Sequence, residues 1–136
     1  MGNRVVVTGL GCMSPLGNDV SSSWEACTTG QSGIDRITHF DPELFRCQIA
    51  GEIKNFQLPE IIPIKEAKKM DRFIQYAIGA TQEALLDANL EITEDIEEEV
   101  GVSMGVGIGG LGCIEKYTKI MVEHGPKRVS PFFIPM

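Results

Sequence analysis

Apolar residues along the chain follow two different patterns. The first, a short uninterrupted apolar run, predicts strands. Residues 4–8 and 100–106 are short runs rich in Val, with no alternation of polar and apolar positions. Such runs are typical of strands that are buried on both faces of a parallel sheet. A third strand is predicted around residues 48–53, within a mixed region that also contains prolines.

The second pattern, in which apolar positions lie three and four residues apart, predicts three helices. The first begins after Asn18 or Asp19, ends near Thr29 before Gly30, and is expected to turn Val20, Trp24 and Cys27 inward. The second covers residues 65–89, with an apolar stripe from residue 70 to residue 88. The third covers residues 111–124 before Gly125-Pro126, and its inward side chains are expected to be Leu111, Ile114, Tyr117 and Met121. Helices that alternate with few strands predict an incomplete α/β domain.

Charge and composition narrow the classes of function. The 136 residues carry 12 Lys and Arg against 19 Asp and Glu, a net charge of −7, which argues against a general nucleic-acid binder. Six carboxylates in residues 91–99 are expected to form a solvated surface segment. The chain has no apolar run of membrane-spanning length and no hydrophobic signal segment, so we expect a cytoplasmic protein. Its four cysteines lack CxxC and zinc spacings, and we expect them to be reduced.

A glycine-rich turn precedes the third predicted helix. Gly105, Gly107 and Gly110 match the spacing GxGxxG between a predicted strand and a helix, the context that a dinucleotide site requires. No clear second strand follows that helix, however. The other interpretation is that the glycines allow close packing, and that the turn presents Ile108 to a ligand chain.

Two further features have both a functional and a structural interpretation. Cys113 lies in the first turn of the third predicted helix, where a thiol can be activated, but no motif supplies a base, and a buried inert Cys is the alternative. Lys65, Lys68, Lys69 and Arg72 fall on one face of the second predicted helix. That basic stripe is either a solvated face or a docking surface for an acidic partner.

Taken together, the motifs resemble those of the β-ketoacyl-acyl-carrier-protein synthases, and among these the type II elongating enzymes. The resemblance runs in order along residues 1–136, and we interpret the chain as the N-terminal portion of such a domain. The motifs that carry it are Arg4-Val-Val-Val-Thr-Gly-Leu-Gly, Ser14-Pro-Leu-Gly-Asn, Trp24, Gly30-Gln-Ser-Gly-Ile, His39-Phe-Asp, Lys68-Lys-Met-Asp-Arg-Phe-Ile-Gln-Tyr-Ala, Gly107-Ile-Gly-Gly-Leu and Ser130-Pro-Phe-Phe-Ile-Pro.

The resemblance implies a thiolase-like α/β fold and a homodimeric acyltransferase of fatty-acid biosynthesis. Such an enzyme performs a decarboxylative Claisen condensation with malonyl groups on acyl carrier protein, and it uses no metal or dissociable cofactor. The nucleophilic Cys and two catalytic His of the family have no counterpart in residues 1–136. We therefore predict no catalytic residue in this chain, and we expect it to be inactive alone.

The resemblance also assigns binding roles. Gly107 and Ile108 match the turn that lines the acyl-chain pocket, and Phe133 with Ile134 matches the segment that closes the pocket of the partner subunit. Lys65, Lys68 and Lys69 match the basic residues that meet acyl carrier protein. Two alternatives stay open: a non-catalytic homologue such as a chain-length factor, and a nucleotide-binding α/β domain.

Overall fold

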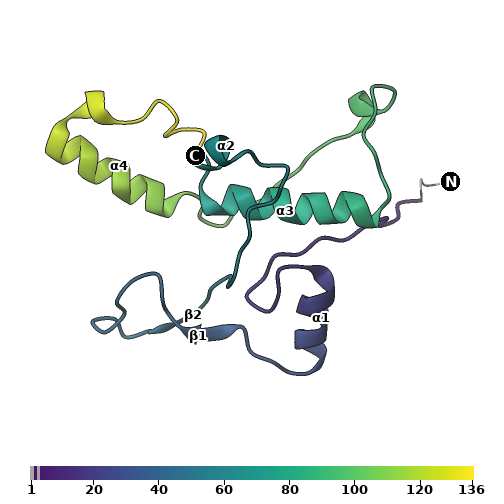
Figure 1. Cartoon of the computed structure of the whole chain (residues 1–136), viewed down its shortest axis with the longest axis horizontal. Coiled ribbons are helices and arrows are strands. Elements are labelled where there is room, and N and C mark those ends of the chain that lie inside the picture. The colour runs from purple at the N-terminus through teal and green to yellow at the C-terminus, as the bar shows by residue number, and fades with distance from the viewer. Residues whose placement is uncertain (1, 3) are drawn as a thin grey trace. The chain divides into compact units, whose positions relative to one another are not determined.

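The computed structural model describes residue 2 and residues 4–136 (Figure 1). Its longer elements are α1 (Val20–Thr28), α3 (Arg72–Asp87) and α4 (Leu111–His124). The shorter ones are β1 (Ile34–Arg36), β2 (Ile49–Gly51), α2 (Ile64–Ala67), η1 (Glu97–Glu99) and η2 (Pro126–Arg128). The chain forms two compact units: unit 1 is Met1–Gln57 with Gly79–Thr93, and unit 2 is Leu58–Ile78 with Glu94–Met136.

In unit 1, α1 begins and ends at the predicted residues but buries a different face. The carboxylate of Asp19 accepts a hydrogen bond from the Ser22 amide at 2.7 Å, and Gly30 ends the helix with a φ of 71°. The buried residues of α1 are Ser23 and Ala26, whereas Trp24 is 68% exposed. The predicted face was wrong because Ser23 contacts polar groups of the preceding loop, donating to the Gly17 carbonyl at 3.1 Å.

Carboxylates of α3 hold the loop that precedes α1. Glu83 accepts the Cys12 amide and the Val20 amide, each at 2.8 Å, and Asp87 accepts the Leu10 amide at 2.9 Å. The backbone at Gly11 approaches α3 so closely that a Cβ there would overlap the Ala80 carbonyl group. A glycine at this position therefore lets the loop lie directly against the helix.

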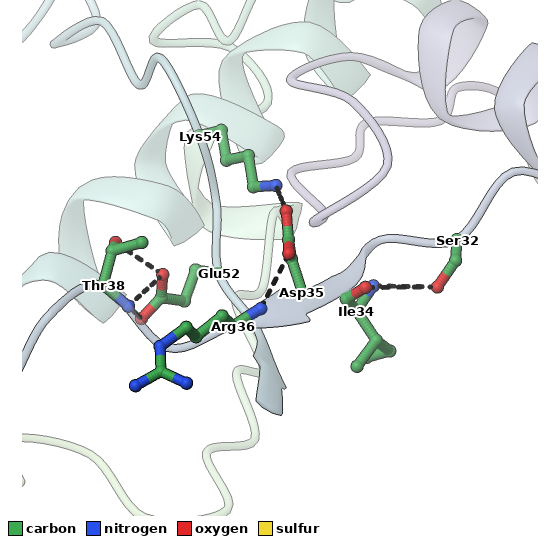
Figure 2. A network of polar contacts seen from close by, with 7 residues as sticks. All are labelled: Ser32, Ile34, Asp35, Arg36, Thr38, Glu52 and Lys54. Carbon is green, nitrogen blue, oxygen red and sulfur yellow. Dashed lines mark hydrogen bonds and ion pairs between the residues drawn. The ribbon is translucent and has the colours of Figure 1, made fainter. Parts of the chain in front are cut away.

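A two-stranded antiparallel hairpin completes unit 1, with Ile34 opposite Gly51 and Arg36 opposite Ile49. Figure 2 shows its polar contacts: the Lys54 ammonium lies 2.8 Å from Asp35, and Glu52 accepts the hydroxyl and the amide of Thr38. The Thr38 hydrogen bond lowers the pKa of Glu52, and the hydrogen bond from Lys54 lowers the pKa of Asp35. The strand predicted over residues 48–53 is confirmed in its central part.

The strands predicted at residues 4–8 and 100–106 are absent from the structure. Both segments lack regular secondary structure, and Val5 and Val102 are 91% and 82% exposed. A β-strand is held by backbone hydrogen bonds to a neighbouring strand, and neither segment pairs with any described residue. The prediction of strands here was wrong for this chain because nothing within the described residues supplies that neighbour.

In unit 2, α4 spans the predicted residues and is followed by Gly125 with a φ of 82° and by Pro126. Tyr117 is buried as predicted, whereas Leu111, Ile114 and Met121 are 63%, 47% and 48% exposed. The acidic segment of residues 91–99 precedes α4, and all of its residues except Ile96 are solvent-exposed.

The described residues bury few hydrophobic side chains: Ala26 in unit 1, and Ile62 and Tyr117 in unit 2. Much of the apolar surface is therefore open for packing against other protein. No helix among the described residues has the length and hydrophobicity needed to cross a membrane.

Candidate functional site

The four basic residues of the predicted stripe lie on a helix break and not on one helix. One helix was predicted over residues 65–89. The structure instead has α2, a turn at residues 68–71, and α3. Gln75 explains the break, because its side-chain amide donates at 3.1 Å to the carbonyls of both Ala67 and Met70. These carbonyls therefore find partners without a continuous helix.

The three lysines of this corner differ in their surroundings. Lys65 lies in α2 and Lys68 caps its C-terminus; both are exposed, and neither makes an ion pair with the described residues. Lys69 is half-buried, lies 2.7 Å from Glu66, and stacks over the Phe132 ring at 5.0 Å from the ring centre. Lys65 and Lys68 are therefore the two lysines of this corner most open to a partner.

The glycine-rich turn 105–110 leads directly into α4. Gly110 has a φ of 68°, a left-handed conformation that suits glycine, and a Cβ at Gly109 would lie 2.9 Å from Val106 and 3.0 Å from the Phe73 ring. Gly107 has open space around it, and Ile108 is 79% exposed. The close-packing interpretation of the glycines thus holds at Gly109. Since no strand precedes the turn in the described chain, the strand–turn–helix context of a dinucleotide site is missing.

An apolar depression of about 380 Å³ lies beside this turn, within unit 2. Phe133 and Ile134 line it, whereas Gly107 and Ile108 do not. The rings of Phe133 and Tyr117 pack in a T-shaped arrangement, with ring centres 5.3 Å apart. The structure therefore brings together two of the four residues predicted for an acyl pocket. The other residues that line the depression are Phe73, Val106, Gly109, Gly110, Cys113, Ile114 and Met136.

Cys113 has the surroundings of a structural thiol. Burial and the nearby Asp71 carboxylate raise its pKa, although it lies in the first turn of α4. A raised pKa lowers the fraction of the reactive thiolate at neutral pH. This agrees with the inert alternative. All four cysteines are free thiols, and the described residues contain no cluster of three or more potential metal ligands.

Sequence reasoning missed three side chains that position these regions. They are Gln75, which stabilises the helix break, Phe132, which contacts Lys69, and Glu83, which holds the loop before α1. No periodic signal marks Gln75 or Glu83, since each acts through a hydrogen bond to backbone outside its own helix.

Residues 2–136 match the family described as beta-ketoacyl synthase, N-terminal domain. The chain is 50% identical over 133 residues to a 3-oxoacyl-[acyl-carrier-protein] synthase 2 of Staphylococcus aureus and 54% identical over 132 residues to one of Vibrio harveyi. These alignments cover 98% and 97% of this chain, but only 32% of either relative.

Solved structures show the same relationship. A β-ketoacyl synthase from Burkholderia phymatum matches with a TM-score of 0.76 and 27% identity over 96% of this chain and 32% of that chain. The ishigamide ketosynthase/chain length factor matches with a TM-score of 0.73 and 28% identity over 95% of this chain and 32% of the other. The fold is therefore that of the thiolase-like ketosynthases, which confirms the predicted α/β class.

The chain belongs to the β-ketoacyl synthase family, and it matches the N-terminal domain of that family. It spans about one third of the length of the curated relatives that it matches, each named 3-oxoacyl-[acyl-carrier-protein] synthase 2.

Proposed function

We propose that this chain forms the N-terminal part of a condensing enzyme of fatty-acid elongation. The enzyme would join an acyl group to a malonyl unit on acyl carrier protein by decarboxylative Claisen condensation. The observation that carries this proposal is the identity of 50% and 54% to two synthases across nearly the whole chain. The experiment is to incubate the full-length protein with acyl- and malonyl-carrier protein, and to measure the release of CO₂ and the 3-oxoacyl product. A full-length protein that forms neither product contradicts the proposal.

The proposal assigns binding roles and no catalytic role to residues 1–136. Condensation needs a thiolate that holds the acyl group and donors that stabilise the developing oxyanion. The raised pKa of Cys113 disfavours it as that thiolate. The nucleophile and the imidazoles are expected in the two thirds of the relatives' length that this chain does not cover.

The acyl-pocket role of Gly107, Ile108, Phe133 and Ile134 is part of the proposal. Its support is that Phe133 and Ile134 line an apolar depression and that Ile108, on the adjacent turn, is 79% exposed. An exposed branched side chain on such a turn is available to contact an acyl chain or a second subunit. Closure of the pocket by the partner subunit of a homodimer belongs to the same proposal.

Ile108→Phe in the full-length protein is expected to shorten the longest acyl group that is accepted. The larger ring would overfill a site that long chains must enter, and overpacking costs about 1–3 kcal/mol. We would measure kcat/KM for a series of acyl donors, with Ile108→Leu as a control of similar volume. An equal loss for short and long donors would remove Ile108 from the pocket.

Carrier-protein docking is proposed for the basic corner, chiefly through Lys65 and Lys68. Both are exposed and make no ion pair with the described residues, so their charge is free to attract an acidic partner. Complementary charge of this kind acts mainly on the encounter rate and weakens as salt screens it. Lys69 also belongs to this corner, although Glu66 already occupies its ammonium.

Lys65→Glu with Lys68→Glu is expected to raise KM for carrier-bound donors at low salt and to spare donors on small thioesters. Each contact is hydrated, so the effect of each is about 0–1 kcal/mol before the reversed charge adds repulsion. The double variant Lys54→Glu with Lys119→Glu changes the net charge equally, at lysines that already have partners 2.8 and 2.7 Å away. If this control raises KM as much, or if salt has no influence, the corner does not dock the carrier protein.

A second candidate function is that of a non-catalytic homologue, such as a chain-length factor. The observation that favours this candidate is the structural similarity to the ishigamide ketosynthase/chain length factor. The two candidates differ in whether an acyl group becomes bound to the protein. Transfer of a labelled acyl group from carrier protein to a cysteine of the full-length protein supports the synthase, and its absence supports the homologue.

A cytoplasmic setting completes the proposal, since there the four free thiols stay reduced.

A further inference from the structure

Residues 130–136 form a turn segment whose two adjacent rings contact different neighbours. Hydrogen bonds within the segment fold it: the Phe132 amide donates to the Ser130 hydroxyl at 3.1 Å, and the Met136 amide donates to the Phe132 carbonyl at 3.0 Å. The Phe132 ring lies under the Lys69 ammonium, and the Phe133 ring packs against Tyr117 of α4 in a T-shaped arrangement. The segment therefore joins the turn after α2 to α4, all within unit 2.

Lys69 is held on two sides, unlike the other lysines of the corner. Its ammonium is 2.7 Å from the Glu66 carboxylate and 5.0 Å from the centre of the Phe132 ring, and its side chain is 38% exposed. A cation over an aromatic face is attracted by the electron density of the ring. The ion pair alone would contribute little at this exposure, but together the two contacts fix where the ammonium lies.

The contact with Phe132 sits next to the predicted pocket residues. Phe133 and Ile134 follow Phe132 directly in the chain, and both line the apolar depression. A displacement of Phe132 would shift the backbone that carries them. Lys69 therefore contacts the residue that precedes two lining residues, although it does not line the depression itself.

We propose that Lys69 is a positioning residue, whose contact with Phe132 holds the segment 130–136 against the apolar depression. The role of that segment in acyl binding rests on the proposed function, whereas the contact itself can be tested independently of it. Lys69 thereby differs in kind from Lys65 and Lys68, which the structure leaves exposed.

Cys113 reports on whether the segment is closed. Its sulfur lies 4.0 Å from the sulfur of Met136, the last residue of the segment, and the thiol is half-buried. Opening of the segment uncovers Cys113 to a small alkylating reagent. The rate of its alkylation by iodoacetamide, resolved by mass spectrometry of the Cys113 peptide in the full-length protein, therefore measures how often the segment opens.

Lys69→Met and Phe132→Leu are each expected to speed alkylation of Cys113 by about two- to five-fold, the factor equivalent to one partly exposed cation–π contact. Lys69→Arg keeps the charge and the stacking, and is expected to react as the wild type does. The double variant is expected to react no faster than the faster single variant, because both changes remove one shared contact.

Matched controls separate this contact from general loosening. Lys119→Met removes a lysine whose ion pair with Glu115 is also 2.7 Å long, and Phe40→Leu removes an exposed ring that packs on Phe45 at 5.4 Å. Both should leave the alkylation rate unchanged. The proposal is overturned if Lys69→Met and Phe132→Leu behave as these controls do, or if their effects multiply in the double variant.

A kinetic measurement tests the consequence for the pocket. With donors on small thioesters, Lys69→Met and Phe132→Leu should both change the ratio of kcat/KM for long acyl groups to that for short ones, and Lys69→Arg should keep the wild-type ratio. A Lys69→Met variant impaired only with carrier-bound donors would make Lys69 a docking residue and overturn its positioning role. Absence of condensation by the wild type would instead contradict the proposed function, and the alkylation rates would still decide whether Lys69 holds the segment.

Discussion

Purified residues 1–136 are expected to show no condensation of acyl- and malonyl-carrier protein above the blank. The reason is chemical: the acyl group needs a thiolate, and burial and the nearby Asp71 carboxylate raise the pKa of Cys113, which disfavours its thiolate form. Full-length protein at equal concentration is the positive control. We would measure CO₂ release and 3-oxoacyl product for both.

Variation of Cys113 makes this expectation sharper. Cys113→Ser in the full-length protein is expected to retain its condensing activity, since the structure gives this thiol a packing role beside Met136. Turnover by isolated residues 1–136 would contradict the assignment of binding roles alone to this chain. If such turnover is lost when Cys113→Ser is made in the isolated chain, Cys113 is the nucleophile. If it persists, the chemistry lies elsewhere in residues 1–136.

Glu83→Ala is expected to release the loop between Leu10 and Val20. Its half-buried carboxylate accepts two backbone amides at 2.8 Å, and hydrogen bonds to a charged group are the stronger ones in proteins. Loss of both is expected to cost about 2–3 kcal/mol, or roughly 30- to 150-fold in local opening. Hydrogen exchange of the Cys12 and Val20 amides would measure this.

Two further variants serve as controls for the loop. Glu83→Gln keeps one acceptor oxygen but turns an NH₂ group toward the other amide, and should recover only part of the protection. Glu98→Ala removes an exposed carboxylate of η1 and should leave both amides protected. Unchanged exchange in Glu83→Ala would show that packing at Gly9 and Gly11, and not the carboxylate, holds the loop.

Local chemistry in the sequence determined the features that need only neighbouring residues. The end of α1 at Gly30 and the span of α4 with its stop at Gly125-Pro126 were predicted correctly, and of the two predicted cap residues it is Asp19 that caps α1. The family was also predicted from motifs, because several short patterns in a fixed order are specific even when each alone is weak.

Of the predicted site residues, the structure brings Phe133 and Ile134 into one depression and leaves Ile108 exposed on the adjacent turn. The acyl-pocket and docking roles themselves stay predictions. Sequence reasoning treated Lys65, Lys68 and Lys69 as equivalent, since residue type and spacing do not reveal that a ring 63 positions along the chain lies under one of them.

Contacts between distant residues decided the rest. The periodicity of residues 65–89 predicted one helix, because an apolar stripe cannot reveal that the Gln75 amide satisfies the carbonyls of Ala67 and Met70. The face of α1 depended on polar groups of the loop before it, and that loop is held by Glu83 and Asp87, which lie 63 to 77 residues along the chain from the amides they accept. The Val-rich segments show the same dependence: their composition favours strands, but a strand forms only where a neighbour accepts and donates its backbone hydrogen bonds.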